Sequence, residues 1–574
     1  MWDENKRQIK IRRDVKFNQN TEFNKIENGL NEKFHEIKPL IVEECESDDI
    51  ETNRKLDDEY NENKVEVDRV IETTEKTRRD RKLPAKYNDY IMITYEEAVC
   101  GNEKEEWLRA VEEEKRCLEK NGTWEFVDKK QAEGSKLLTS KWIFKVKDDG
   151  RYKARLVVRG YEQEKYADYT ETFSPVVDSS SIRALLTLAV NRKMKFKFFD
   201  IKTAFLNGLL EEKIYMKCPQ GYDNKDQVCL LKKALYGLKQ APHQWNKRFT
   251  EFLKMNNLYQ LKTDECIFRN KNGSLFLGLY VDDGLICYTD EGKVEELFTK
   301  MSEEFEFTRN DDPKMYIGLE LERSENKIKL TQKRYTQNIL ERFQMENSKP
   351  TDTPIAKITE LGGKEKDEEV MFPYNQAVGS LLYLTQKTRP DIAYAVSFES
   401  RKLENPGKID VSNVKRTLRY LRKTKEKGIV YEETENLELI AYSDADFAGD
   451  TETRRSTSGY VIFFSGGPLS WCSRRQPIVS LSSTEAEYIS AAECVKETLF
   501  LKYLLEEMFD QPIPVTLRVD NQSAIRLAET GKMNRRSKHI DVRYYFISER
   551  IKDKSIYIEY CPTDDQVADI LTKP

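Results

Sequence analysis

Two neighbouring carboxylates, Asp282 and Asp283, stand inside an otherwise apolar stretch of the sequence. Burying an unpaired charge costs several kcal/mol, so a compensating group must lie nearby. Leu275–Leu279 and Leu285–Cys287 predict two short β-strands, and Asp282-Asp283-Gly284 predicts the tight turn between them, since Asp and Gly suit turn geometry. Such a hairpin presents both acids at its tip, where a divalent cation such as Mg²⁺, which prefers oxygen ligands, can neutralise them.

A third carboxylate, Asp200, precedes this pair in the sequence. Phe196–Ile201 predicts a strand that ends near this acid, and Lys202–Gly208 predicts a turn into a short helix. Asp200 beside the acidic hairpin tip would give three carboxylates for two metal ions. Two metals about 3.5–4 Å apart can stabilise both the attacking and the leaving oxygen of an in-line phosphoryl displacement. The three acids together therefore indicate phosphoryl transfer, whereas an isolated acidic turn is more often a solvated one.

A second set of acids lies toward the end of the sequence. Leu439–Asp444 predicts a strand that ends in an acid, and Asp520 ends a later one. Hairpin strands, among them 477–481, are expected between the two, followed by a helix that carries Glu487. Strand, hairpins, helix, strand and a final acid-bearing segment are the order of elements in an RNase H fold.

In order and spacing, these segments resemble the reverse transcriptase and RNase H of copia-type LTR retrotransposons. The matching segments are 140–147, 153–161, 199–208, 235–245, 280–283, 379–384, 389–392, 443–450 and 454–460, with Phe447 in place of the more usual tryptophan. They cover most of residues 85–574. The resemblance implies an α+β and α/β multidomain chain, in which a right-hand polymerase (fingers, palm and thumb) is followed by a connection region and an RNase H-like α/β domain.

The resemblance also implies two Mg²⁺ ions in each active site, with Mn²⁺ as a possible substitute. The catalytic, metal-binding residues that match are Asp200, Asp282 and Asp283 in the polymerase and Asp444, Glu487, Asp520 and Asp569 in the RNase H part. Two alternatives stay open. Glu485 could take the place of Glu487, and Asp541, which would otherwise orient substrate with His539, could take the place of Asp569.

Four further residues are candidates for nucleotide binding. Lys153 and Arg155 lie on a predicted fingers hairpin, where they would reach the incoming triphosphate or simply solvate an exposed strand. By resemblance, Gln240 lies near the nucleotide and the template. Phe205 stands where these reverse transcriptases place an aromatic ring beside the sugar, which would clash with a ribose 2′-hydroxyl. The alternative for Phe205 is an ordinary core phenylalanine.

The net charge of −5 is unusual for a protein that binds nucleic acid, but the acidity is local. Residues 43–76 carry fourteen Asp and Glu against five Lys and Arg, a net charge of −9, so the rest of the chain carries −5 − (−9) = +4. High charge and few aromatic residues are typical of disorder. We therefore expect a linker here.

Five segments are expected. They are a remnant of an integrase C-terminal tail at 1–20, an acidic disordered linker at 21–80, the fingers, palm and thumb at 81–355, a connection region at 356–435 and the RNase H-like domain at 436–574. The chain would then be a piece of a longer polyprotein. Its thumb part, 290–355, is expected to be mostly helical, with Lys327, Lys329, Lys333 and Arg334 gripping the duplex backbone.

The leading hypothesis is an RNA-directed DNA polymerase with RNase H activity. Its expected partners are an RNA template, a DNA primer, deoxynucleoside triphosphates and an RNA–DNA hybrid. The sequence contains no run of eighteen apolar residues, so no membrane span is expected. Ten scattered cysteines without a Cys-x-x-Cys pair argue against a zinc site and favour a reduced, intracellular setting, cytoplasmic or nuclear.

Two other hypotheses compete with this one. The first is a decayed or domesticated remnant that binds nucleic acid without catalysis, which would be expected to have lost some of the carboxylates. The second is an integrase fragment, which the three histidines of the chain and the lack of a third acid set disfavour.

Overall fold

The computed structural model describes residues 93–147, 150–222, 224, 226–356, 372–530 and 541–574, together with the short antiparallel strands β1 (Trp2–Asp3) and β2 (Gln8–Ile9). The chain divides into two units, Met1–Asp80 and Arg81–Pro574. Apart from β1 and β2, the predicted integrase tail and the acidic linker lie outside the described residues.

The predicted fingers are built from two short sheets and two helices. Strands β5 (Ser140–Val146) and β6 (Tyr152–Val158) form an antiparallel hairpin. A four-stranded sheet has the order β3-β9-β8-β4, and its strands are β3 (Trp124–Asp128), β4 (Leu137–Leu138), β8 (Leu209–Lys217) and β9 (Gln227–Lys233). Helix α2 (Lys104–Lys120) packs on the hairpin through Trp107, which makes edge contacts with the rings of Phe144 and Tyr152. Helix α1 (Tyr95–Cys100) contacts it through Tyr95, whose ring stacks on that of Trp142 with centres 6.0 Å apart.

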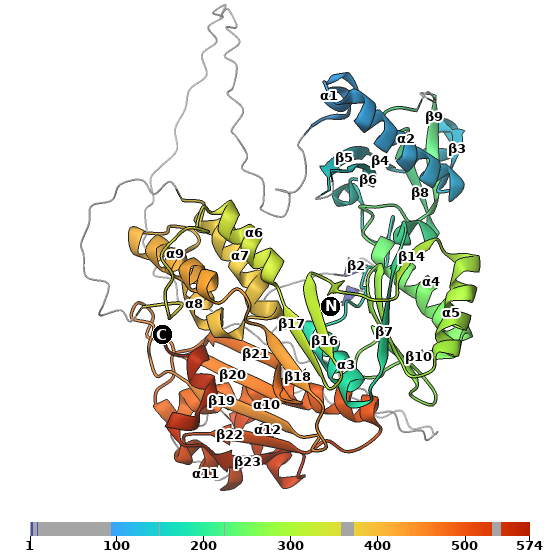
Figure 1. Ribbon diagram of the computed structural model, residues 1–574. Helices are drawn as coiled ribbons and strands as arrows, with labels where there is room; N and C mark the ends of the chain where they lie inside the picture. The colour runs from blue at the N-terminus through green and yellow to red at the C-terminus, as the bar shows by residue number, and fades with distance from the viewer. Residues whose placement is uncertain are drawn as a thin grey trace, which may run out of the picture. The chain divides into compact units, whose positions relative to one another are not determined.

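The predicted palm is a six-stranded sheet with helices on both faces (Figure 1). Its order is β10-β11-β12-β13-β7-β14, with bounds β7 (Lys195–Ile201), β10 (Leu258–Gln260), β11 (Ile267–Asn270), β12 (Leu275–Tyr280), β13 (Asp283–Tyr288) and β14 (Phe307–Asn310). Phe196 and Phe198 of β7 pack with α3 (Ser179–Asn191) on one face. Phe199 packs with α4 (Ala241–Met255) and α5 (Glu291–Glu304) on the other face.

The expectation that 290–355 is mostly helical is wrong. Between α5 and α6 (Lys333–Arg342) lie β14 and the strands β15 (Met315–Tyr316), β16 (Leu319–Ser324) and β17 (Lys327–Thr331), which β18 (Ile429–Glu432) extends to a four-stranded sheet. Three of the four predicted backbone-gripping cations are paired with carboxylates: Lys327 with Glu432 at 3.4 Å, Lys329 with Glu322 at 3.4 Å and Lys333 with Glu426 at 2.7 Å. Their charge is therefore partly compensated within the protein.

Helix α6 shares one apolar core with α7 (Tyr374–Lys387), α8 (Ala393–Glu399) and α9 (Lys408–Lys423). Leu340 of α6, Leu381 of α7 and Leu418 of α9 are all fully buried in it. The expected border between thumb and connection region, at 355/356, thus falls between helices that bury their apolar faces against each other.

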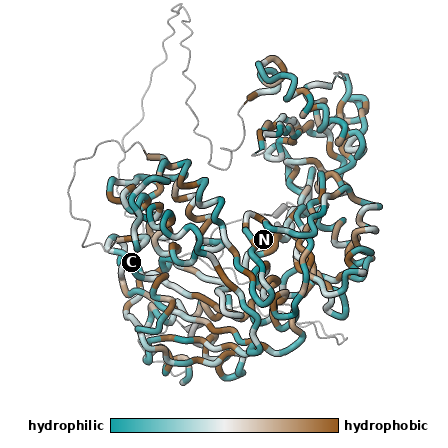
Figure 2. Tube along the Cα trace, viewed as in Figure 1, coloured by the Kyte–Doolittle hydropathy of each residue, from teal (hydrophilic) through white to brown (hydrophobic). Residues whose placement is uncertain are grey.

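The predicted RNase H-like part contains a five-stranded mixed sheet with the order β21-β20-β19-β22-β23 (Figure 1). Its strands are β19 (Leu439–Ala445), β20 (Thr457–Phe464), β21 (Gly467–Arg475), β22 (Val515–Val519) and β23 (Tyr557–Tyr560), and β22 runs parallel to both of its neighbours. Apolar residues concentrate in this sheet (Figure 2). The expected strand at 477–481 is absent; β21 ends at Arg475 and an irregular segment follows.

Helix α10 (Ser483–Phe509) is the long helix that packs on this sheet, and α11 (Gln522–Thr530) and α12 (Asp541–Lys552) follow it. The palm helix α3 shares its core with α10. Arg183 of α3 is buried at this junction, where it donates to the carbonyls of Leu469 on β21 at 2.6 Å and of Gln386 on α7 at 3.2 Å. Within the described residues no helix is both long and apolar enough to span a membrane.

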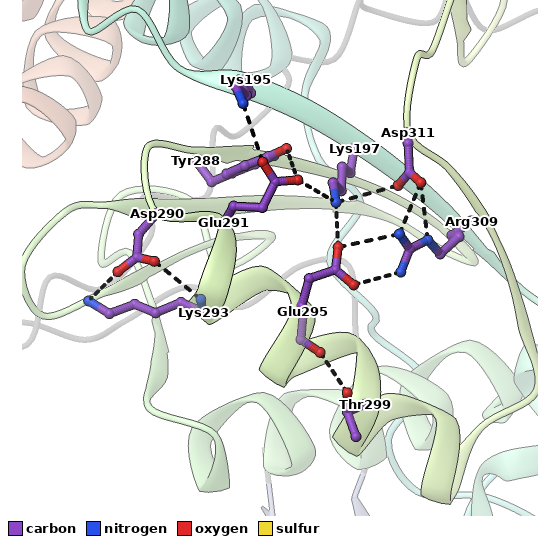
Figure 3. A network of polar contacts seen from close by, with 10 residues as sticks. All are labelled: Lys195, Lys197, Tyr288, Asp290, Glu291, Lys293, Glu295, Thr299, Arg309 and Asp311. Carbon is purple, nitrogen blue, oxygen red and sulfur yellow. Dashed lines mark hydrogen bonds and ion pairs between the residues drawn. The ribbon is translucent and has the colours of Figure 1, made fainter.

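A buried lysine fastens the palm sheet to α5 (Figure 3). Lys197 points from β7 toward three carboxylates, and its ammonium lies 2.9 Å from Glu291, 3.6 Å from Asp311 and in contact with Glu295. Arg309 of β14 pairs with Glu295 at 2.8 Å and with Asp311 at 2.9 Å. Hydrogen bonds from Lys197 and Lys195 lower the pKa of Glu291 to about 2. The cluster thus compensates acids that would otherwise repel one another.

Lys197→Met is expected to lower the free energy of unfolding by about 1–2 kcal/mol at pH 7, since it leaves the acids less compensated. A carboxyl whose pKa is depressed on folding adds stability above its unfolded pKa, about 4.5, and this stability is lost as the pH falls toward 2. The difference between variant and wild type, measured by thermal melting across pH 2–7, should therefore narrow below about pH 4.5. Lys195→Met, at an exposed partner of Glu291, is the matched control and should change stability by less than about 0.5 kcal/mol. If the stability difference between K197M and wild type stays constant from pH 2 to pH 7, Lys197 does not act by stabilising the charged acids.

Candidate functional sites

The acid-bearing hairpin of the palm turns one residue earlier than expected. Tyr280 of β12 pairs with Asp283 of β13, so the turn consists of Val281 and Asp282, and Gly284 lies within the strand. The prediction of an Asp282-Asp283-Gly284 turn is therefore wrong. Gly284 is needed for another reason: it pairs with Phe199, whose ring would lie 2.0 Å from a Cβ atom at this position.

The hairpin brings the three predicted polymerase acids together. Asp283 lies directly opposite Asp200 of β7, and the amide of Ile201 donates to the carbonyl of Asp282 at 2.9 Å. Burial, followed by the charges of Asp282 and Asp200, raises the pKa of Asp283 to about 6. The pKa of Asp200 is also raised, by burial and then by Asp282. Carboxylates are the oxygen ligands that a hard divalent cation prefers, and a cation bound among these acids would favour their charged forms. In this structure their oxygens do not converge as those of Asp444, Asp520 and Asp569 do, which form the group within the described residues whose ligand atoms lie within 4.8 Å of one another.

Two predicted nucleotide-binding cations lie near these acids. Lys153 and Arg155 on β6 are among the positive charges that lower the pKa of Asp200, against the effect of burial. The guanidinium of Arg155 lies 4.4 Å from the centre of the Tyr236 ring. Sequence reasoning missed Glu114 of α2, a buried carboxylate that accepts a hydrogen bond from the amide of Leu156 at 3.3 Å, and whose pKa is raised by burial. Apart from this carboxylate, Lys153 and Arg155 place positive charge on the fingers strand β6, close enough to act on Asp200.

Phe205 and Gln240 occupy different environments. Phe205 lies in the short helix Ala204–Asn207, half-buried, with its ring 5.3 Å from that of Tyr236 in an edge contact. Gln240 is fully buried, and its amide is held by Gln163 at 3.0 Å and by the carbonyl of Asp168 at 2.8 Å. Gln240 therefore ties the start of α4 to the segment around residues 163–168.

Three predicted RNase H ligands also come together. Asp444 on β19, Asp520 after β22 and Asp569 in the short helix Val567–Leu571 each offer an oxygen, and these oxygens lie within 4.8 Å of one another. Lys573 places its ammonium 2.8 Å from Asp569 and 3.6 Å from Asp444. The hydroxyl of Thr572 also donates to Asp444. This acid cluster can hold a cation, and a protein ammonium already lies beside it.

The two candidate glutamates of α10 differ in their surroundings. Burial, followed by the charges of Asp444 and Asp520, raises the pKa of Glu487 to about 9, and one of its carboxylate oxygens is buried without a hydrogen-bond partner in the part of the chain that the structure describes. Glu485 instead accepts a hydrogen bond from the amide of Leu481 at 2.7 Å, at the start of the helix. The charges of Asp444 and Asp520 thus link Glu487 to the acid cluster.

The alternative fourth ligand cannot be compared in the same way. Asp541 begins α12, but its side chain and the whole of His539 lie outside the described residues.

The chain is similar to known proteins over most of its length. Residues 121–357 match the family model described as reverse transcriptase (RNA-dependent DNA polymerase). The Pol polyprotein of transposon TNT 1-94 from Nicotiana tabacum is 41% identical over 520 residues, covering 86% of this chain and 39% of the relative. That of transposon RE2 from Arabidopsis thaliana is 37% identical over 491 residues, covering 83% and 33%. The chain thus spans about two fifths or less of these relatives' length.

At lower sequence identity, the chain is also similar to a yeast polyprotein and to a solved viral structure. A truncated Ty1-A Gag-Pol polyprotein from Saccharomyces cerevisiae is 25% identical over 517 residues, covering 84% of this chain and 43% of the relative. Among solved structures, a foamy viral protease–reverse transcriptase in complex with double-stranded DNA aligns with 79% of this chain and 69% of its own, at a TM-score of 0.47 and 12% identity. The family model and the plant relatives carry the assignment: the chain belongs to the Pol polyproteins of copia-type retrotransposons.

Proposed function

We propose that this chain is an RNA-directed DNA polymerase that copies an RNA or DNA template by two-metal phosphoryl transfer, and that its last domain hydrolyses the RNA strand of RNA–DNA hybrids. The observation that carries the proposal is the meeting of Asp200, Asp282 and Asp283 at neighbouring strand ends, inside the segment that matches the reverse transcriptase family.

In the polymerase, Asp200, Asp282 and Asp283 would hold Mg²⁺ between the primer end and the triphosphate. Bound there, the metal would stabilise charge on the attacking and leaving oxygens. Lys153 and Arg155 would bind the triphosphate of the incoming deoxynucleotide, and Phe205 would exclude a ribose 2′-hydroxyl. Gln240 would act through the segment that it holds, since its amide is already bonded within the protein.

In the RNase H domain, Asp444, Glu487, Asp520 and Asp569 would hold a second pair of cations beside the scissile phosphate. Mn²⁺ would substitute for Mg²⁺ in both sites, because both ions accept oxygen ligands. The competing proposal, a remnant that binds nucleic acid without turnover, is disfavoured because each assigned carboxylate is present in the sequence.

Primer extension on a poly(rA) template with an oligo(dT) primer tests the proposal directly. We expect incorporation of deoxythymidine triphosphate in the presence of Mg²⁺ and none after chelation. Retention of the primer–template by a protein that never extends it would instead support the binding remnant.

The sugar gate can be tested at Phe205. Phe205→Val should raise the incorporation of ribonucleotides relative to deoxynucleotides by about tenfold, since a smaller side chain opens space toward the 2′ position. Phe205→Tyr keeps the ring and is the control, in which the ratio should stay near that of wild type. The kcat/KM of each nucleotide in single-nucleotide extension measures this ratio, and an equal ratio in wild type and F205V would indicate a core phenylalanine.

A further inference from the structure

The turn that presents the polymerase acids has a strained backbone. Val281 has a φ of +59°, in the left-handed region that a β-branched residue rarely adopts. Strain of this kind persists only where the surrounding structure holds it in place. Because Asp282 and Asp283 directly follow Val281, the conformation of this residue decides where both carboxylates point.

Trp245 of α4 holds the strained residue. Its indole Nε1 donates a hydrogen bond to the carbonyl oxygen of Val281 at 2.7 Å. The indole itself is immobilised, since Trp245 is 1% exposed, stacks on Phe249 with ring centres 5.1 Å apart and meets the edge of Phe305 at 5.7 Å. The donor is therefore fixed by packing, and its acceptor is the carbonyl oxygen of the strained residue itself.

The same turn of α4 also supports the segment that follows Asp200. Gly208 lies so close to α4 that a Cβ atom there would be 3.0 Å from the backbone of Gln244 and of Trp245. In the hairpin turn itself, two backbone carbonyls accept hydrogen bonds from fixed donors. The carbonyl of Val281 accepts from the indole of Trp245, and that of Asp282 accepts from the amide of Ile201. The amide of Ile201 belongs to β7, the strand that carries Asp200, and the indole of Trp245 belongs to helix α4.

We propose that Trp245 is a positioning residue of the polymerase site, whose N–H holds Val281 in the left-handed conformation and thereby aims Asp282 and Asp283 at the metals. This inference rests on the proposed polymerase function. Without the bond, Val281 relaxes toward negative φ, the next peptide rotates and the carboxylates leave the position opposite Asp200. A misplacement of about 1 Å in a catalytic constellation costs about a hundredfold in rate.

Trp245→Phe removes the N–H and keeps an aromatic ring in the core. We expect kcat to fall by about ten- to a hundredfold, the KM for the deoxynucleotide to change little and the Mg²⁺ concentration for half-maximal rate to rise. A merely structural defect would lower the active fraction without changing the Mg²⁺ requirement. Hydrogen–deuterium exchange of residues 280–284 should also become faster, because the turn opens more often.

Val281→Gly supplies the second arm, since glycine adopts positive φ at little cost. The hairpin turn then depends less on the hydrogen bond from the indole. W245F should therefore lower kcat by a clearly smaller factor in the V281G background than in wild type. If W245F lowers kcat by the same factor in both backgrounds, the proposal is overturned, because independent sites give additive effects.

Trp471→Phe is the matched control. It removes the same kind of bond, from an indole Nε1 to the carbonyl of Thr385 at 2.7 Å, outside the polymerase site. It should leave exchange at 280–284 and the Mg²⁺ requirement of extension unchanged. If W245F does not fold, benzothienylalanine at position 245 keeps the shape and lacks only the N–H.

The exchange measurement does not depend on activity. If the wild-type chain fails to extend primers while W245F still accelerates exchange at the turn, the positioning contact stands and the polymerase function is wrong. If wild type extends primers and W245F leaves both exchange and Mg²⁺ requirement unchanged, the positioning role is wrong and the function stands.

Discussion

Asp200→Asn and Asp282→Asn should each lower magnesium-dependent primer extension by at least about a hundredfold, because each removes a charged ligand from the proposed metal site. The loss should not come from unfolding. Burial and two neighbouring acids raise the pKa of Asp283 to about 6, so removing one of these charges relieves repulsion in the metal-free protein. The melting temperature of both variants, measured without metal, should therefore equal or exceed that of wild type.

RNase H cleavage is the internal control for these variants. Asp444, Asp520 and Asp569 form a separate acid cluster on a different sheet, so hydrolysis of the RNA strand should persist in D200N and D282N. Asp283→Asn should be as severe or milder. Substantial extension by D200N or D282N would remove the palm assignment, whatever the state of the RNase H domain.

The three polymerase acids could be found from the sequence because each lies at or beside the end of an apolar strand, which is a local signal. The position of the hairpin turn could not, since the apolar flanks fit a turn at 281–282 and one at 282–284 equally well. The decision comes from Phe199, on a strand far away in the sequence, whose ring fills the space beside Gly284. Turn residues therefore predict a hairpin more reliably than they predict its register.

The strands between α5 and α6 were missed for a different reason. In Lys327–Thr331, polar and apolar residues alternate, which is a strand pattern, and Ile328 and Leu330 are indeed buried. The lysines of this segment are compatible with a strand, because they alternate with the buried residues Ile328 and Leu330. The charged residues therefore indicate a solvent-exposed surface, and the alternation of polar and apolar residues indicates that a strand carries it.

Contacts between distant elements left no trace in the sequence. Glu114 beneath the fingers hairpin, Lys197 among three acids and the indole of Trp245 on Val281 all join segments that only the fold brings together. By contrast, Asp444, Asp520 and Asp569 were assigned from resemblance, and the structure brings the three side chains together. Which of them bind metal is still a prediction.

Asp444→Asn should lower cleavage of the RNA strand in an RNA–DNA hybrid by at least about a hundredfold, while primer extension survives. Asp444 is nearly fully buried on the central strand β19, next to Asp569 and Asp520, so it would be a central ligand of the metals that the proposal requires. Burial raises its pKa to about 6 against the effects of Thr572 and Lys573. A gel assay on a labelled hybrid measures cleavage, and primer extension by the same preparation is the control for folding.

The fourth ligand is decided by comparing two variants. Asp569→Asn should lower cleavage less than D444N does and raise the metal concentration that cleavage requires, because Asp569 is less buried than Asp444 and its carboxylate lies only 2.8 Å from the ammonium of Lys573. Added Mn²⁺ should partly restore its activity, since Mn²⁺ binds the same N and O ligands more tightly than the hard Mg²⁺ does. Asp541→Asn should leave the metal requirement unchanged and affect at most substrate binding. If D541N instead abolishes cleavage while D569N cleaves like wild type, Asp541 is the ligand, and the proximity of Asp569 to Asp444 reflects only its pairing with Lys573.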